Sequence, residues 1–161
     1  MGGKVGTMVE NNIREQAMEF LELLIDKPLC YGFKSSAWDL YDFGFGPLRH
    51  VPSRRNPKRK VGAFVLHVTC RFKIVCKIGK SRVKRFYEDT TSEEFHCAIQ
   101  PVIGLPVKRV ALSEENDLWL DFGDYWIVFV TYENNEESWR FFTFTDDARH
   151  LVASDRWITL D

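Results

Sequence analysis

Cysteine and histidine are the residues of this sequence that could hold a metal ion or serve as nucleophile and base. Four cysteines, Cys30, Cys70, Cys76 and Cys97, are separated by 40, 6 and 21 positions. This spacing matches neither a set of zinc ligands nor a Cys-x-x-Cys redox pair. His67 is three positions from Cys70, so on a regular strand the two would face opposite sides. We therefore expect neither a bound metal nor a cofactor.

A nucleophilic site has no local signature either. Cysteine–histidine catalysis needs a thiol beside a base and an orienting group, and here such a site would have to be assembled from distant segments. The sequence contains no Gly-x-Ser-x-Gly, no glycine-rich phosphate loop and no His-Glu-x-x-His. We expect a protein that is not an enzyme. A pocket that holds His67 or His150 beside carboxylates or cysteine would instead support a dispersed active site.

Charge is distributed very unevenly along the chain, although the net charge is only −1. Residues 1–42 hold 4 basic and 7 acidic side chains, residues 43–87 hold 13 and none, and residues 88–161 hold 5 and 16. Such segregation points to a surface that recognises a charged partner. The candidate partner-binding residues are Arg49, Arg54, Arg55, Lys58, Arg59, Lys60, Arg82, Lys84 and Arg85.

The basic segment 49–85 has three interpretations. Its lysines and arginines could contact phosphates of DNA or RNA while nearby aromatic residues stack on bases. They could recognise the acidic surface of another protein. They could also be neutralised in place by the acidic C-terminal strands. A net charge near zero argues against nucleic acid, because nucleic-acid binders carry a strong positive excess, so we favour internal compensation or a protein partner.

Three stretches of the chain combine strand-like hydrophobic residues with histidine, tryptophan and arginine. They are Leu66–Phe72 (LHVTCRF), Asp117–Phe122 (DLWLDF) and Glu137–Phe142 (ESWRFF), the last followed by His150-Leu151-Val152. Together they resemble a group of small, uncharacterised bacterial proteins with the pattern LHxxCxWR … LxLxF … ExWRFF … HLV. That group is similar to the immunity proteins that accompany bacterial polymorphic toxins. The chain departs from the pattern at Arg71-Phe72, where the group has Trp-Arg.

This resemblance implies an immunity-like inhibitor that binds a toxin-like protein. The residues that carry it are His67, Cys70, Trp139, Arg140 and His150, for which we expect structural roles. Trp139 and Arg140 are adjacent on a predicted strand, so their side chains point to opposite faces. We expect Trp139 to pack while Arg140 pairs with an acidic neighbour or stacks on an aromatic ring.

Hydrophobic periodicity predicts the elements that position these residues. Residues 10–26 have the apolar spacing of a helix that ends before Pro28, and residues 89–99 predict a short helix capped by Thr91 or Ser92. The proline-rich residues 47–60 predict an exposed loop. Runs of alternating or β-branched residues predict strands over 37–45, 61–78 (continuous, or bent near Cys70-Arg71), 82–87, 107–112, 117–122, 125–132, 138–145, 150–154 and 157–161.

These elements predict a single α+β domain over residues 1–161. An N-terminal helix should pack on a predominantly antiparallel β-sheet, with a meander in the C-terminal half and Leu118, Leu120 and Phe122 facing the core. No segment has the ~20 apolar residues of a membrane span, and the N-terminus lacks a signal-peptide core. We therefore expect a cytoplasmic protein without membrane contact; its oligomeric state is left open.

Overall fold

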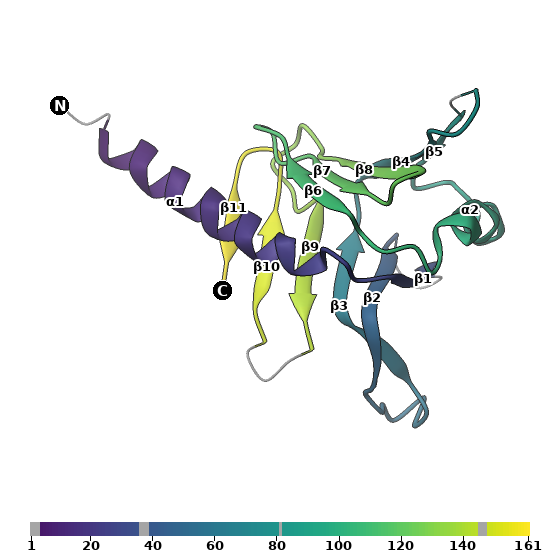
Figure 1. Ribbon diagram of the computed structural model, residues 1–161. Helices are drawn as coiled ribbons and strands as arrows, with labels where there is room; N and C mark the ends of the chain where they lie inside the picture. Colours follow the sequence, from purple (N-terminus) through teal and green to yellow (C-terminus); the bar gives the residue numbers. More distant parts are fainter. Residues whose placement is uncertain (1–3, 36–38, 81, 145–147) are drawn as a thin grey trace.

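The strands form two antiparallel sheets with a shared core between them (Figure 1). The computed structural model describes residues 4–35, 39–80, 82–144 and 148–161. The larger sheet has the strand order β1-β2-β3-β9-β10-β11, and each neighbouring pair is antiparallel. Its strands are β1 (Leu29–Lys34), β2 (Tyr41–His50), β3 (Lys60–Val68), β9 (Trp139–Thr143), β10 (His150–Ala153) and β11 (Ile158–Leu160).

The smaller sheet has the strand order β5-β4-β8-β7-β6. Its strands are β4 (Arg71–Cys76), β5 (Arg82–Phe86), β6 (Arg109–Leu112), β7 (Leu118–Asp121) and β8 (Tyr125–Val130). The chain crosses between the sheets at Thr69-Cys70, and both backbone N–H groups there donate to the carbonyl oxygen of Ser138, at 3.0 and 3.1 Å. The predicted run 61–78 is therefore two strands, β3 and β4. The second of the two predictions, a bend near Cys70-Arg71, is the one that the structure has.

In the described residues, two α-helices flank the sheets. Helix α1 (Lys4–Leu21) continues into the 3-10 turn η1 (Glu22–Leu24) and crosses the β9–β11 part of the larger sheet (Figure 1). It buries Ala17, Phe20 and Leu21, which are among the apolar residues at helical spacing in the predicted helix 10–26. Helix α2 (Ser92–Ile99) continues into η2 (Gln100–Val102). Thr91 caps α2 in a capping box with Glu94, because each side chain accepts a hydrogen bond from the other's backbone N–H.

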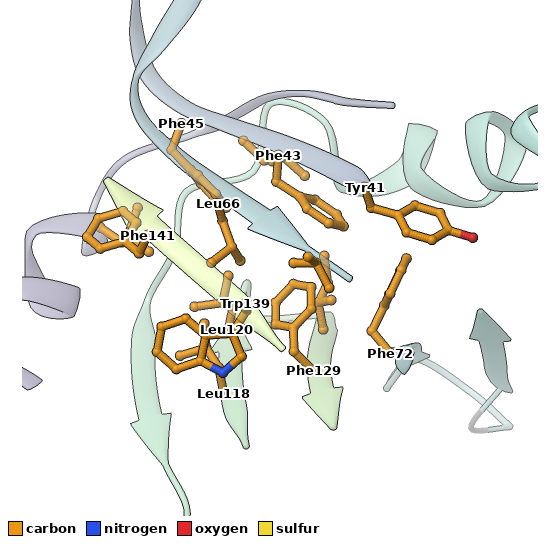
Figure 2. Packing of buried hydrophobic residues seen from close by; sticks show 14 of the residues in the cluster. Tyr41, Phe43, Phe45, Leu66, Phe72, Leu118, Leu120, Phe129, Trp139 and Phe141 are labelled. Carbon is orange, nitrogen blue, oxygen red and sulfur yellow. The ribbon is translucent and has the colours of Figure 1, made fainter. Parts of the chain in front are cut away.

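Aromatic rings from both sheets fill the core (Figure 2). Phe43 of β2 packs edge-to-face on Phe72 of β4 and on Phe129 of β8, with ring centroids 5.5 and 5.3 Å apart. Such arrangements bring the positive edge of one ring to the negative face of another. On β7, Leu118 and Leu120 are fully buried, which confirms that even positions face the core.

The α+β class and the helix packed on antiparallel sheet are confirmed. The C-terminal strands are divided, however: β6, β7 and β8 belong to the smaller sheet, and β9, β10 and β11 belong to the larger one. Strand β1 was not predicted. The first residues of the predicted strand 37–45 and the last of 138–145 lie outside the described residues. No helix in the described ranges is long and apolar enough to cross a membrane.

The loop predicted over residues 47–60 is wrong at both ends, because β2 continues to His50 and β3 begins at Lys60. Pro47 favours a loop in the sequence, since proline cannot donate to a strand ladder. In the structure Pro47 lies within a register shift between Phe45 and Leu48. An irregularity of this kind accommodates proline without ending the strand.

Candidate functional site

The β2–β3 hairpin extends beyond the rest of the larger sheet (Figure 1). Strand β1 pairs with β2 only as far as Phe45, and β9 pairs with β3 only from Phe64. We call residues 47–60, which lie past this point, the basic hairpin. Its tip is closed by backbone hydrogen bonds, from Val51 N to the Arg59 oxygen at 2.9 Å and from Ser53 N to the Asn56 oxygen at 3.0 Å. The segment is thus an ordered arm.

Six of the candidate binding residues lie on this arm, and all six side chains are exposed: Arg49, Arg54, Arg55, Lys58, Arg59 and Lys60. In the described parts of the chain, none of them forms an ion pair. The internal compensation considered for the basic segment is instead found at Lys77, whose Nζ lies 3.0 Å from Asp121 Oδ1. The basic hairpin therefore presents its positive charge to solvent, with Leu48 half exposed at its base.

The other three candidate residues, Arg82, Lys84 and Arg85, lie on β5 in the smaller sheet. Figure 1 shows β5 on the side of the molecule away from the hairpin tip. The segment 49–85 therefore does not form one continuous surface.

The residues of the family-like pattern separate into two groups. Cys70 and Trp139 are buried in the core. The strand register places the polar members together on the outer face of the larger sheet: His67 of β3 lies opposite Arg140 of β9, and His150 of β10 lies opposite Phe142 of β9. All five residues were expected to have structural roles, and their sequence positions did not indicate that three of them share one outer face.

Contacts on this outer face are close. His67 Nε2 lies 3.4 Å from Asp42 Oδ2, and its ring meets the Phe142 ring edge-on at 4.7 Å between centroids. His150 stacks on the same Phe142 ring at 5.3 Å with an interplanar angle of 8°. The phenyl ring thus contacts both imidazoles. Carboxylate beside imidazole is a base with its orienting group, but among the described residues no hydroxyl or thiol hydrogen-bonds to His67.

Arg140 pairs with an acidic neighbour, as predicted. Its Nε and Nη2 atoms donate to the two carboxylate oxygens of Glu137, at 3.1 and 2.9 Å. These hydrogen bonds raise the pKa of Arg140, and the bidentate geometry fixes the guanidinium plane. Trp139, on the opposite side of the strand, is fully buried.

A glycine lets an aromatic residue cover part of the same face. The Tyr31 ring lies over Gly44, where an added Cβ would be 2.2 Å from the ring. The Tyr31 hydroxyl accepts a hydrogen bond from Gly62 N at 3.3 Å. Burial, helped by the nearby Asp42 carboxylate, raises the pKa of Tyr31 to about 12. Tyr31 is therefore a neutral, half-buried side chain that fixes the position of β1 against the hairpin strands.

An open hollow of about 760 Å³ connects the basic hairpin with this face. Arg49, His50 and Val51 line it from the base of the hairpin, and Phe142, Phe144 and His150 line it from β9 and β10. It offers apolar rings beside a fixed positive charge, which suits a side chain that is apolar at one end and anionic at the other. Among the described residues no three histidine, cysteine or acidic side chains are placed to hold a metal ion.

The cysteines should differ strongly in reactivity. Burial raises the pKa of the Cys70 thiol, whereas Cys97 is exposed on α2. Because the thiolate is the reactive form, we expect a thiol reagent at pH 8 to label Cys97 first and Cys70 only after denaturation. Mass spectrometry of peptides from timed samples measures this. A Cys97→Ser variant should lose the fast phase, and rapid labelling of Cys70 in the native protein would contradict the prediction.

No family model, curated protein or solved structure matches this chain. The resemblance of its three sequence stretches to the immunity-like group therefore stays a prediction.

Proposed function

We propose that this protein is a non-enzymatic binding protein, an immunity-like inhibitor of a bacterial toxin, that engages an acidic surface of its partner through the basic hairpin. The observation that carries the proposal is the set of six exposed cations on an ordered arm, which have no ion pair among the described residues. The resemblance of the three sequence stretches supports the choice of partner.

Physical reasons favour a protein partner for this arm. An arm whose backbone is already ordered loses little conformational entropy on binding. Its uncompensated charge would steer an acidic partner toward it and raise the association rate. The hollow between the hairpin base and His150 would supply a place for an apolar anchor, the kind of contact that carries most of the affinity in protein interfaces.

The test uses the full chain and the product of the gene adjacent to its own, because an immunity protein is expected beside its toxin. We expect the two to co-purify and the chain to neutralise the toxin. Reversal of two hairpin charges, Arg54→Glu with Arg55→Glu, should lower the association rate at low salt by roughly tenfold or more. The matched control, Lys73→Glu with Arg85→Glu, makes the same charge change on the smaller sheet and should leave that rate nearly unchanged.

Two results would overturn this proposal. The first is the absence of both binding and neutralisation by the native chain. The second is a complex whose association rate is equally affected by the hairpin variant and by its control, because the hairpin would then have no special part in the encounter.

A further inference from the structure

The outer face of the smaller sheet, turned away from the core, exposes large side chains. Val83 is 42% exposed, Val130 40% and Trp119 37%. Apolar residues on an outer strand face indicate an interaction surface when charged residues accompany them. The residues we call the cationic-aromatic face are Arg71, Lys73, Lys77, Arg85, Arg109, Trp119 and Trp126.

The strand register brings these residues together from distant segments. In one row Lys73 lies opposite Arg85 on β5 and opposite Val128 on β8, and Val128 in turn lies opposite Trp119 on β7. In the next row Trp126 on β8 lies opposite Asp121, which is paired with Arg109 of β6. Four inter-strand spacings make the face roughly 19 Å wide.

The two indole rings lie at the centre of this face. Their centroids are 5.7 Å apart in an edge-on arrangement. Lys73 Nζ lies 6.0 Å from the centre of the Trp119 ring, and Lys77 Nζ lies 4.5 Å from that of Trp126. A cation over an indole is attracted by the ring quadrupole, so aromatic surface and positive charge are interleaved here.

The charge of the face is strongly positive. Lys77 and Arg109 share the single carboxylate of Asp121, at 3.0 and 3.6 Å. Arg71, Lys73 and Arg85 have no ion pair in the described ranges. The nearby Asp117 carboxylate accepts hydrogen bonds from the Thr131 backbone and hydroxyl. These three cations therefore have no carboxylate partner among the described residues and can meet an anionic ligand, although the whole chain has a net charge of only −1.

We propose that the cationic-aromatic face binds single-stranded nucleic acid. Bases stack on Trp119 and Trp126 after the lysine chains move aside, and phosphates contact Arg71, Lys73 and Arg85. Indole rings accept any base, so the binding has little sequence preference. An open face of this kind can reach unpaired bases, whereas the bases of a duplex are stacked out of reach. A protein partner is less favoured for this face, because lysine is depleted in protein interfaces and Lys73 and Lys77 lie over the two indole rings at its centre.

The test uses the full chain and fluorescent twelve-nucleotide oligo(dT) and oligo(U). We expect micromolar binding at 50 mM salt, quenching of tryptophan fluorescence, and weaker binding to a DNA duplex. Three phosphate contacts predict a slope of about −2 for log affinity against log salt. Trp119→Ala should weaken binding roughly tenfold. The pair Lys73→Glu with Arg85→Glu should weaken it further and reduce the slope to about −0.7.

The matched control is Arg54→Glu with Arg55→Glu, which makes the same charge change on the basic hairpin and should leave affinity and quenching nearly unchanged. Circular dichroism and thermal melting establish that each variant is folded.

The proposal fails if the native chain does not bind, if the hairpin variant weakens binding as much as the sheet variant, or if Trp119→Ala has no effect. It also fails if polyglutamate competes as well as oligo(U), since the face would then recognise an acidic protein. None of these results depends on the partner of the hairpin.

Discussion

Replacement of Trp139 by alanine is expected to lower the free energy of unfolding by about 4 kcal/mol. The indole is fully buried beside the central strands of the larger sheet (Figure 2). Its Nε1–H donates to the backbone oxygen of Asn116 at 2.9 Å. The substitution therefore leaves a large cavity and a buried carbonyl without its partner. Urea unfolding followed by circular dichroism measures the loss.

Trp119 provides a matched control, because it is the same residue type on the outer face of the smaller sheet and is 37% exposed. Trp119→Ala removes an edge-on ring contact and part of the buried area but leaves no enclosed cavity, so we expect a smaller loss, about 2 kcal/mol. Equal losses for the two variants would contradict the position of Trp139 in the core.

Asn116 should be the most sensitive polar position. Its side-chain amide donates to the Ser154 oxygen at 2.8 Å, and its Oδ1 accepts from Arg14 Nη1 at 2.6 Å. Its backbone has a φ of 64°, a left-handed conformation that asparagine tolerates better than alanine. This one residue thus links α1, the turn before β7 and the turn after β10.

Two substitutions separate these contributions. Asn116→Gly keeps the left-handed backbone accessible but removes the hydrogen bonds, for an expected loss of about 2 kcal/mol. Asn116→Ala adds the backbone cost, about 1 kcal/mol more. Chemical unfolding of both variants gives the difference. A glycine variant as stable as the native chain would mean that the amide contacts contribute nothing.

Local features of the fold could be predicted from the sequence because they depend on neighbours along the chain. The alternation of Leu118, Leu120 and Phe122 sets the inner face of β7, and Thr91 with Glu94 forms the cap of α2 whatever packs around it. The division into two sheets could not be predicted. Alternation tells which side chains share a face of a strand, but it does not tell which strand lies beside it.

In the candidate sites, too, local features could be predicted from the sequence, whereas contacts between remote strands could not. The exposure of the basic hairpin could be predicted from its composition. The contact of His67 with Asp42, and the place of Lys73 beside Trp119, depend on pairing between remote strands. Trp119 and Trp126 were missed as site residues, because an aromatic residue on a strand more often belongs to the core. The only local sign was the odd position of Trp119 in a strand whose even positions are apolar.

Ser138 joins the two sheets at a single buried point. Its carbonyl accepts the backbone N–H groups of Thr69 and Cys70, its N–H donates to the Ala153 oxygen, and its hydroxyl accepts from Tyr132 N. The chain passes between the sheets from β3 to β4 and again from β8 to β9. Hydrogen bonds to Ser138 hold both passages. Neither sheet can come apart without breaking this junction and exposing the aromatic layer of the other. We therefore expect the two sheets to unfold together as one cooperative unit.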